Sequence, residues 1–303
     1  MLEKNISPSI AKTIRDLNSN SSTRIRVDGE LSNDVPTLTG VRQGDSLSPF
    51  LFNLVMDKII EDTASLNIGY KMGDHMLNIV CYADDATIIA ESEKDLQQLL
   101  QQFHTAAMRY NMSISISKTK CMTLAREQVT CNVMINGTML EQVTKFKYLG
   151  VNIVCNSDLY GEVLEQTQKA AAISGCLKNM IWKNKHMNIQ SKVRIYKTCV
   201  RPIMTYGIES RADTVRTKSL LRTSEMKILR NITGKTLRDR IRNTEIRKTC
   251  EVEDIVRWGR QRRRFWNEHV GRMADSRAAK IAKNELPQGN RPPGRPPKRW
   301  RDS

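Results

Sequence analysis

Two adjacent aspartates, Asp84 and Asp85, stand between two apolar, β-prone runs in the stretch CYADDATIIA, residues 81–90. Carboxylates side by side repel each other, and each loses hydration free energy when it is buried without a partner. The flanking apolar runs favour burial, whereas the carboxylates favour solvent. Both preferences are satisfied if residues 77–90 form strand, turn and strand with the carboxylates at the solvent-facing turn. We therefore predict a β-hairpin whose strands pack on other elements.

The chemistry of such a turn depends on what lies next to the carboxylates. A divalent cation between them and an oxyanion would offset their repulsion. Mg²⁺ prefers carboxylate oxygens together with substrate phosphates, and polymerases hold two such ions ~3.5–4 Å apart for in-line phosphoryl transfer. A solvated Asp-Asp turn is the alternative, because aspartate is common in turns. The two residues alone favour that alternative.

Helical spacing of apolar residues follows in several segments of the first half. These segments are residues 8–17, 48–60 and 92–110. A glycine-bearing loop leads into the second, for which Ser48 is the predicted N-cap and Pro49 lies in the first turn. Ser92 is the predicted N-cap of the third.

Strand signals are equally frequent before residue 157. Two dipeptides that favour tight hairpin turns are Asp28-Gly29 and Asn136-Gly137. Residues 114–124 and 146–154 each predict one further strand. The first half is therefore expected to be an α+β structure of antiparallel hairpins with packing helices.

The pattern changes near residue 158, after which helical patterns dominate and strand signals nearly vanish. The formal net charge of the 303-residue chain is +17, and residues 231–303 hold 20 Lys+Arg against 9 Asp+Glu. Such an excess indicates a polyanionic partner, most commonly nucleic acid, with a solvated basic surface as the alternative. Trp258 and Trp266, spaced by eight residues among arginines, are expected on a buried helical face, although stacking on bases is the alternative.

The cysteines and the hydropathy of the chain exclude several classes of protein. The seven cysteines show no CxxC or zinc-finger spacing, which predicts reduced thiols and a location in the nucleus or cytoplasm. No apolar run approaches the ~20 residues of a membrane-spanning helix. The N-terminus also lacks the apolar segment of a signal peptide.

Four segments, in order, resemble the motifs of the reverse transcriptases of non-LTR (LINE-type) retrotransposons. YADD, residues 82–85, resembles the YxDD box, and GVRQGDSLSPFLFNLVMDKI, residues 40–59, resembles the preceding motif B. ISISKTK, residues 114–120, resembles the lysine-bearing motif D, and FKYLGV, residues 146–151, resembles motif E. The basic stretch that begins at residue 257 resembles the segment that closes many animal elements of this kind.

The resemblance assigns a metal role to the aspartate pair. Asp84 would be a principal ligand of Mg²⁺, and Asp85 a second, weaker one. Tyr82 would lie near the primer terminus, with a plain turn residue as the alternative, and Ala83 would keep the turn small.

The resemblance also implies contacts with the nucleotide and the template. Gln43 and Gly44 would lie against them, the glycine letting the backbone come close, unless Gly44 serves only the turn before the helix. Arg42 is a candidate phosphate contact or a solvated side chain. Lys118 would be the motif D lysine, which donates a proton to departing pyrophosphate, and Lys120 is the alternative.

These motifs imply a division of the chain into three parts. Residues 1–157 would be a partial polymerase palm (motifs B to E), residues 158–250 a thumb-like helical region, and residues 251–303 a basic helical segment with a Pro/Arg-rich tail. The expected partners are an RNA template and a DNA primer, with dNTP in the intact enzyme, and no membrane.

One family feature is missing from the sequence. Motif A supplies a third aspartate from an apolar strand, and none of Asp16, Asp28 and Asp34 stands in such a strand. We therefore expect the chain to begin just after motif A and to be inactive alone, as a fragment of an RNA-directed DNA polymerase. The alternatives are a catalytically dead, basic nucleic-acid-binding remnant and a fragment without function.

Overall fold

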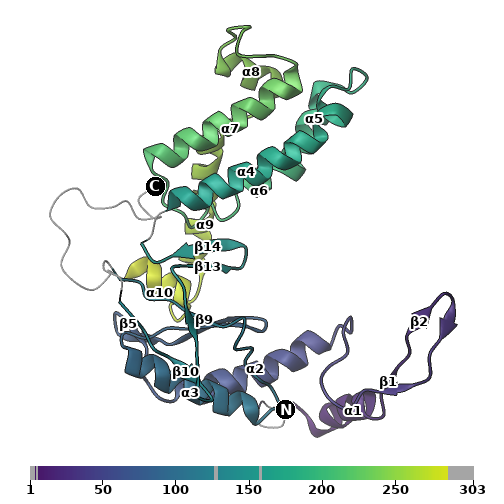
Figure 1. Ribbon diagram of the computed structural model, residues 1–303, viewed down its shortest axis with the longest axis vertical. Coiled ribbons are helices and arrows are strands. Elements are labelled where there is room, and N and C mark those ends of the chain that lie inside the picture. The colour runs from purple at the N-terminus through teal and green to yellow at the C-terminus, as the bar shows by residue number, and fades with distance from the viewer. Residues whose placement is uncertain (1–3, 5, 126–128, 157–158, 286–303) are drawn as a thin grey trace. The chain divides into compact units, whose positions relative to one another are not determined.

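Strands and helices are distributed along the chain as the sequence predicts (Figure 1). The structure is a computed structural model that describes residues 4, 6–125, 129–156 and 159–285. Within these ranges the last strand ends at Val154, and helices follow from Leu159 onward. The predicted change of character near residue 158 is confirmed.

The α-helices of the described residues range from one turn to five. They are α1 (Pro8–Asn18), α2 (Ser48–Ala64), α3 (Glu93–Met108), α4 (Leu159–Leu177), α5 (Ile189–Ile195), α6 (Arg201–Met204), α7 (Val215–Thr233), α8 (Asn243–Cys250), α9 (Ile255–Arg272) and α10 (Ala278–Asn284). Two π-helical turns, η2 (Lys178–Trp182) and η3 (Tyr196–Val200), follow α4 and α5.

The strands are short and pair two by two. The pairs are β1 (Ser22–Thr23) with β4 (Val35–Pro36), β2 (Arg26–Val27) with β3 (Glu30–Leu31), β5 (Tyr70–Met72) with β6 (His75–Leu77), β7 (Ile79–Tyr82) with β8 (Asp85–Ile88), β9 (Lys120–Cys121) with β12 (Glu141–Gln142), β10 (Met134–Ile135) with β11 (Thr138–Met139), and β13 (Lys145–Tyr148) with β14 (Val151–Val154). The β9–β12 pair is parallel. The predicted mixture of helices and small antiparallel hairpins is confirmed.

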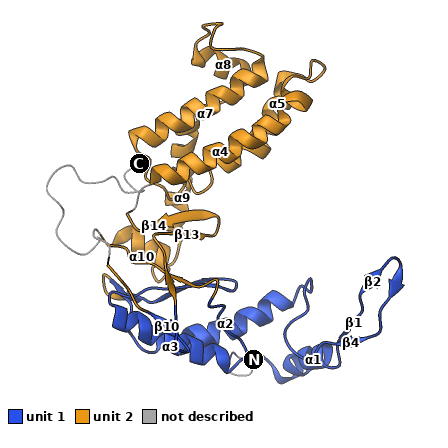
Figure 2. Ribbon diagram, viewed as in Figure 1, with its two compact units in different colours: residues 1–71, 76–116, 133–139 blue, residues 72–75, 117–132, 140–303 orange. Residues whose placement is uncertain are grey.

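Figure 2 shows the chain divided into two compact units, each assembled from several segments. Unit 1 comprises residues 1–71, 76–116 and 133–139, and unit 2 comprises residues 72–75, 117–132 and 140–303. Because the units interleave in sequence, the domain boundaries at residues 157 and 250 stay predictions, as does the thumb-like character of the helical region.

Two hairpin turns form where the local chemistry predicts them. Asn136 and Gly137 have φ of 49° and 74°, and Asp28 and Gly29 have φ of 51° and 93°. Asparagine, aspartate and glycine tolerate this left-handed region best, and two successive positive φ angles match the twist of a two-residue hairpin. Both predicted turns are confirmed.

Two predicted strands were wrong. Residues 146–154 form the hairpin β13–β14 rather than one strand, because Leu149 and Gly150 have φ of 47° and 82° and reverse the chain. Of residues 114–124, only Lys120 and Cys121 are in a strand, and residues 116–118 form a turn.

The predicted N-cap of α2 was also wrong. Ser48 is the first residue inside the helix, and its Oγ donates to the Arg42 carbonyl oxygen at 2.5 Å. Leu47 holds the N-cap position without a side-chain bond, and its N–H donates to Asp45 Oδ1 at 2.9 Å. Ser92 does cap α3, since its Oγ accepts from the Asp95 N–H at 3.1 Å.

The core of unit 1 lies between α2, α3 and the β7–β8 hairpin. Its buried members are Met56, Ile59, Phe103, Ala106 and Ala107. The β1–β4 and β2–β3 pairs expose all of their residues. Unit 1 therefore buries its apolar surface next to the aspartate-bearing hairpin.

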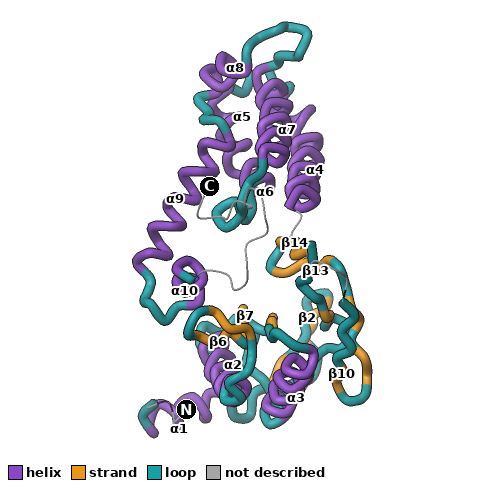
Figure 3. The backbone as a smooth tube through the Cα atoms, turned by 90° about the vertical axis from the view of Figure 1, so that its left-hand side faces the viewer, coloured by secondary structure: helices purple, strands orange, loops and turns teal. Residues whose placement is uncertain are grey.

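The core of unit 2 is larger and comes mainly from helical residues. Helices α4 and α7 lie side by side (Figure 1 and Figure 3) and pack with α5, α6, α8 and α9. Helix α9 comes close to the residue 208 region at Gly259, where a Cβ atom would lie 2.5 Å from Ile208 Cδ1. Glycine at this position permits the close approach.

A buried carboxylate lies inside this helical core. Glu225 of α7, with no exposed side-chain surface, accepts from Tyr196 Oη at 3.1 Å, Arg247 Nη2 at 2.9 Å and the Ile255 N–H at 3.3 Å. Burial raises the pKa of the Glu225 carboxyl, although Arg247 acts in the opposite direction. Burial likewise raises the pKa of Tyr196 well above its ordinary value.

The cysteines differ in exposure. All seven lie in the described ranges, and none of them is in a disulfide bond. Cys176 and Cys199 are exposed, whereas burial raises the pKa of the Cys250 thiol to about 11. Among the helices of the described residues, none combines the length and the apolar character needed to span a membrane.

Candidate active site on the β7–β8 hairpin

The two aspartates lie at the tip of the β7–β8 hairpin. Strand residues pair in the register Ile79 with Ile88 through Tyr82 with Asp85, which leaves Ala83 and Asp84 as the turn. Ala83 has φ of 51°, a left-handed conformation that costs a residue with a Cβ atom about 1–2 kcal/mol. The paired strands on either side hold this strained turn in place.

The two faces of the hairpin have opposite environments. Four side chains of one face pack on the α2–α3 core, namely Ile79, Cys81, Ala86 and Ile88. Tyr82, which pairs with Asp85 across the ladder, is 64% exposed, and both aspartates are exposed. The predicted hairpin, with packed strands and solvent-facing carboxylates, is confirmed.

The donor set at this turn fits a hard cation in kind but is small. Asp84 and Asp85 offer carboxylate oxygens, which Mg²⁺ prefers. Within the described residues, no group of three or more His, Cys, Asp or Glu side chains comes together in a way that could hold a metal ion. The turn can therefore supply only part of a metal site.

The loop before α2 is held by short-range hydrogen bonds. The Arg42 carbonyl oxygen accepts from Ser48 Oγ and, at 3.4 Å, from the Asp45 N–H. Gly44 has φ of 89°, and an added Cβ atom would meet no other atom within 4 Å. Gly44 therefore satisfies the turn and also leaves open space beside the backbone, so both of its predicted roles remain open.

Arg42 has a structural partner that the sequence did not indicate. Its Nη2 donates to the Leu17 carbonyl oxygen at 2.6 Å and to Ser21 Oγ at 2.7 Å. A cation at this place satisfies a carbonyl in the last turn of α1. Gln43, its neighbour, is exposed. The phosphate contact predicted for Arg42 stays a prediction, because at least one of its nitrogens serves the helix end.

The two candidate lysines of motif D lie in unit 2 and differ in their surroundings. Lys118 is exposed in the turn at residues 116–118. Lys120 forms an ion pair with Glu141, with 2.6 Å between Nζ and Oε2, within the β9–β12 pair. Of the two, Lys118 has the side chain that remains available, which favours the first assignment without testing it.

The β13–β14 hairpin, which carries the motif E resemblance, is held by residues that the sequence did not single out. Tyr206 Oη donates to the Leu149 carbonyl oxygen at 2.9 Å, and its ring would lie 3.3 Å from a Cβ atom at Gly150. Glu162 Oε2 accepts from the Asn152 N–H at 3.0 Å and from Asn152 Nδ2 at 2.5 Å. The only sequence signal for these contacts is the Leu-Gly turn itself.

Most of the arginines of α9 form hydrogen bonds or ion pairs within the chain. Arg263, with 1% of its side chain exposed, donates from Nη2 to Asp213 Oδ2 at 2.9 Å and to the Ile208 carbonyl oxygen at 3.2 Å. Arg257, Arg262 and Arg264 form ion pairs with Glu253, Glu209 and Glu268. Sequence periodicity could have identified Arg263, since it continues the buried stripe of Ile255 and Gly259.

The two tryptophans of α9 are half-buried. Trp258 packs against the core of unit 2 and lies under the Arg201 guanidinium, 4.6 Å from the ring centre. Trp266 contacts the His269 ring at 5.4 Å. The expected burial is therefore only partial for both residues, and Trp300 lies outside the described residues.

Comparison with known proteins identifies similar sequences. The family described as reverse transcriptase (RNA-dependent DNA polymerase) matches residues 3–153. The chain is 28% identical over 265 residues to the RNA-directed DNA polymerase from mobile element jockey of Drosophila funebris, covering 83% of the chain and 28% of that protein. It is 31% identical over 167 residues to the retrovirus-related Pol polyprotein from type-2 retrotransposable element R2DM of Drosophila melanogaster, covering 49% and 16%.

A third relative is similar in length to this chain. It is a transposon-derived protein of Caenorhabditis elegans, 28% identical over 234 residues, which make up 73% of this chain and 82% of that protein. By contrast, this chain spans less than a third of the jockey and R2DM proteins that it matches.

Proposed function

Because the chain belongs to the reverse transcriptase (RNA-dependent DNA polymerase) family of non-LTR retrotransposons, we propose that the β7–β8 turn is its nucleotidyl-transfer site. The observation that carries this proposal is the placement of Asp84 and Asp85. Both carboxylates are exposed at a strained turn, while the strands behind them are fixed on the α2–α3 core. Preorganised charge of this kind is what phosphoryl transfer requires.

Reverse transcriptases use divalent metal ions, which stabilise the attacking and leaving oxygens of phosphoryl transfer. In this chain Asp84 and Asp85 would hold one side of a Mg²⁺ ion. With only these two carboxylates at the turn, binding should be weak, since a third charged ligand adds strongly to the affinity for a hard cation.

We infer that the partners are an RNA template and a DNA primer, with dNTP in the intact enzyme. Tyr82 supports a primer contact, because its ring is largely exposed on the same hairpin as the carboxylates. Gln43 and Gly44 support a nucleotide contact through their exposed loop. Arg42 would add a phosphate contact through the nitrogens that α1 does not use.

A second candidate function is nucleic-acid binding without catalysis. It is favoured by the incomplete donor set of the turn in the described residues and by the net charge of +17. The lack of disulfide bonds among the described cysteines supports a reducing location, in the nucleus or cytoplasm.

Labelled dNTP incorporation on an RNA template with a DNA primer tests both functions. The chain alone is expected to bind the template–primer but to give no extension with Mg²⁺ beyond the level of Asp84→Ala. Extension above that control would show that the two carboxylates suffice and would remove the second candidate. Failure to bind template–primer at low salt would contradict both.

A further inference from the structure

A groove of about 560 Å³ runs along one face of α7 in unit 2. Eight of its lining residues follow each other at helical spacing, and these are Val215, Lys218, Ser219, Arg222, Thr223, Met226, Lys227 and Arg230. Leu237, Asn243 of α8 and Arg260 of α9 complete it. Of the lining residues, five are cationic and none is acidic.

The far wall of the groove is built by a buried cation. Arg230 donates from Nη1 to the Thr236 carbonyl oxygen at 3.2 Å, and from Nη2 to the Ile241 carbonyl oxygen at 3.0 Å and to Asn243 Oδ1 at 2.8 Å. These bonds fix the loop between α7 and α8 against α7.

That loop is itself strongly basic. Its exposed cations are Lys235, Arg238, Arg240 and Arg242. The loop has one aspartate, Asp239, which accepts from the Thr236 N–H at 2.5 Å and from Thr236 Oγ1 at 2.9 Å. The loop that carries the lining residue Leu237 therefore has more exposed cations than anions.

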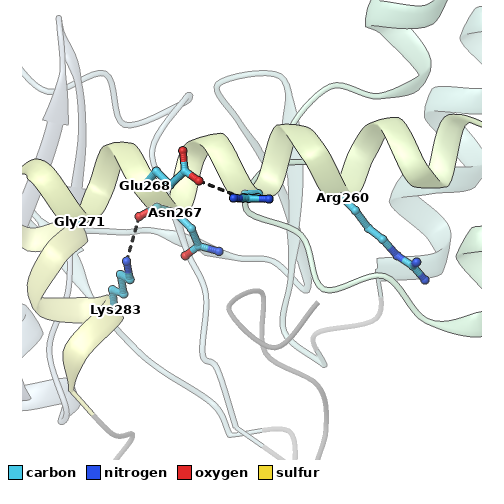
Figure 4. A pocket seen from close by; sticks show the side chains of 6 residues that line it. Arg260, Asn267, Glu268, Gly271 and Lys283 are labelled. Atoms are coloured by element: carbon cyan, nitrogen blue, oxygen red, sulfur yellow. Dashed lines mark hydrogen bonds and ion pairs between the residues drawn. The ribbon is translucent and has the colours of Figure 1, made fainter. Parts of the chain in front are cut away.

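A second hollow, of about 420 Å³, lies further along α9 and is a poorer anion site. Two of its three cations are used internally, since Arg264 Nε donates to Glu268 Oε1 at 3.0 Å and Lys283 Nζ donates to the Asn267 carbonyl oxygen at 2.9 Å. Figure 4 shows Lys283 at Asn267, with Arg260 extending away from them. By contrast, Lys227 and Arg260 of the α7 groove are exposed and have no ion pair among the described residues. Arg222 pairs with Asp254 through Nε and remains half exposed.

We propose that the α7 groove binds the sugar–phosphate backbone of a single nucleic-acid strand, which rests on the proposed function of the chain. The groove's cations rise along α7 from Lys218 to Lys227, about 13 Å at the usual rise per residue. Val215 and Leu237, 86% and 79% exposed at the groove, offer apolar surface to sugars or bases. A ligand with regularly spaced phosphates and apolar faces matches both properties.

The choice of one strand rather than a duplex follows from the size of the groove. Its volume of about 560 Å³ is in the range of pockets that enclose a small ligand. It therefore has room for a few nucleotides of one strand, whereas a duplex would touch only its rim. Unlike the segment from residue 257 onward, this site draws most of its cations from residues 218–242.

Fluorescence anisotropy of a labelled poly-uridine RNA over a salt series tests the proposal. The groove variant is Lys218→Gln/Arg222→Gln/Lys227→Gln/Arg260→Gln, and a milder one is Lys227→Gln/Arg260→Gln. The matched control removes the same charge from exposed cations near α5, as Lys178→Gln/Lys183→Gln/Lys185→Gln/Arg194→Gln.

The groove variant is expected to lose roughly tenfold or more in affinity and to flatten the slope of log K against log salt by roughly 2 to 3, because each phosphate contact contributes about −0.7 for a single strand. The milder variant should lose about half of that slope, and the control less than a quarter. Equal losses in the groove variant and the control would overturn the proposal, while leaving nucleic-acid binding by the chain intact.

Competition separates the other occupants. An unlabelled RNA strand should displace the probe at a lower concentration than an RNA duplex of equal length does, and vesicles of phosphatidylserine should not displace it. Preferential displacement by duplex or by vesicles would overturn the single-strand assignment. If the unaltered chain binds no RNA at all at low salt, the proposed function fails rather than the location of the site.

Discussion

Replacement of Asp213 should strongly lower the free energy of unfolding of unit 2. Its two carboxylate oxygens accept from Arg211 Nε at 3.0 Å and from Arg263 Nη2 at 2.9 Å, and all three side chains are at least 95% buried. Arg211 also donates from Nη1 to Gln166 Oε1 at 3.1 Å. Two buried guanidinium groups therefore share one counter-charge.

The expected cost of Asp213→Asn follows from that arrangement. The side chain keeps nearly its volume but loses its charge, which leaves two cations in a medium of low polarity. Removing the partner of a buried ion typically costs 3–5 kcal/mol. Two guanidinium nitrogens of this cluster, Arg211 Nη2 and Arg263 Nε, already lack hydrogen-bond partners. No nearby acceptor is therefore expected to replace the carboxylate when its charge is removed.

Arg263→Met is the matched comparison, because it removes one cation and leaves Asp213 paired with Arg211. This replacement leaves the Ile208 carbonyl oxygen without its Arg263 donor, which should lower the free energy of unfolding by about 1–2 kcal/mol. Combining the two replacements should cost less than their sum by about 1–3 kcal/mol, since the residues are in direct contact.

Urea unfolding followed by tryptophan fluorescence measures these differences. The three tryptophans of the described residues, Trp182, Trp258 and Trp266, lie in unit 2, and Trp182 is 2% exposed in its core. Breaking a buried ion pair usually costs several kcal/mol, so a loss of less than about 1 kcal/mol of unfolding free energy in Asp213→Asn would refute the reasoning. A larger loss in Arg263→Met than in Asp213→Asn would refute it as well.

Three further predictions concern other parts of the chain. Gly150→Ala should destabilise the β13–β14 hairpin by about 1–2 kcal/mol, because alanine is strained at φ of 82° and its Cβ atom would press on the Tyr206 ring. Faster amide hydrogen exchange of residues 145–154 would show this loss, and unchanged exchange would contradict it. The pKa of Glu225 is raised above its unfolded value near 4.5. The carboxyl therefore contributes fully to the free energy of unfolding below that pH, and this contribution is lost as the pH rises through the folded pKa. Urea midpoints over a pH series should fall less steeply with rising pH in Glu225→Gln than in the unaltered chain, and parallel curves would rule the effect out. Maleimide at neutral pH should label the exposed thiols Cys176 and Cys199 first, and early labelling of the buried thiols, identified by peptide mass spectrometry, would speak against the described burial.

Turns with strong local chemistry were predictable from the sequence, and those shaped by distant contacts were not. Asn136-Gly137 adopts the expected hairpin because both residues tolerate positive φ by themselves. Leu149 carries no such signal, and its φ of 47° is held by the Tyr206 hydrogen bond from more than fifty residues away. Local propensity therefore gave a strand where tertiary contact makes a turn.

Charge in the sequence was a poor guide to charge on the surface. Arg263 belongs to the basic run GRQRRRFW, yet it is a core residue. The count of Lys+Arg includes such residues, because composition does not say which face of a helix each occupies. The stripe formed by Ile255, Gly259 and Val270 was the available signal.

The candidate site was predictable to the extent that it is local. The Asp84–Asp85 turn and its packed strands followed from alternation and charge repulsion within ten residues. The bond from Arg42 to the Leu17 carbonyl oxygen did not, because it joins segments whose proximity only the fold creates. The roles of Gln43, Gly44 and Lys118 stay predictions for the same reason.

Paramagnetic broadening by Mn²⁺ tests the central claim, that the Asp84–Asp85 turn is the metal-holding turn of a reverse transcriptase. Backbone amide signals of the isotopically labelled chain would be followed during Mn²⁺ titration. Signals of residues 82–86 should broaden first, only at millimolar Mn²⁺, and recover on addition of excess Mg²⁺. The effect should vanish in Asp84→Asn/Asp85→Asn. Broadening that begins elsewhere, or that persists unchanged in the double variant, would contradict the claim.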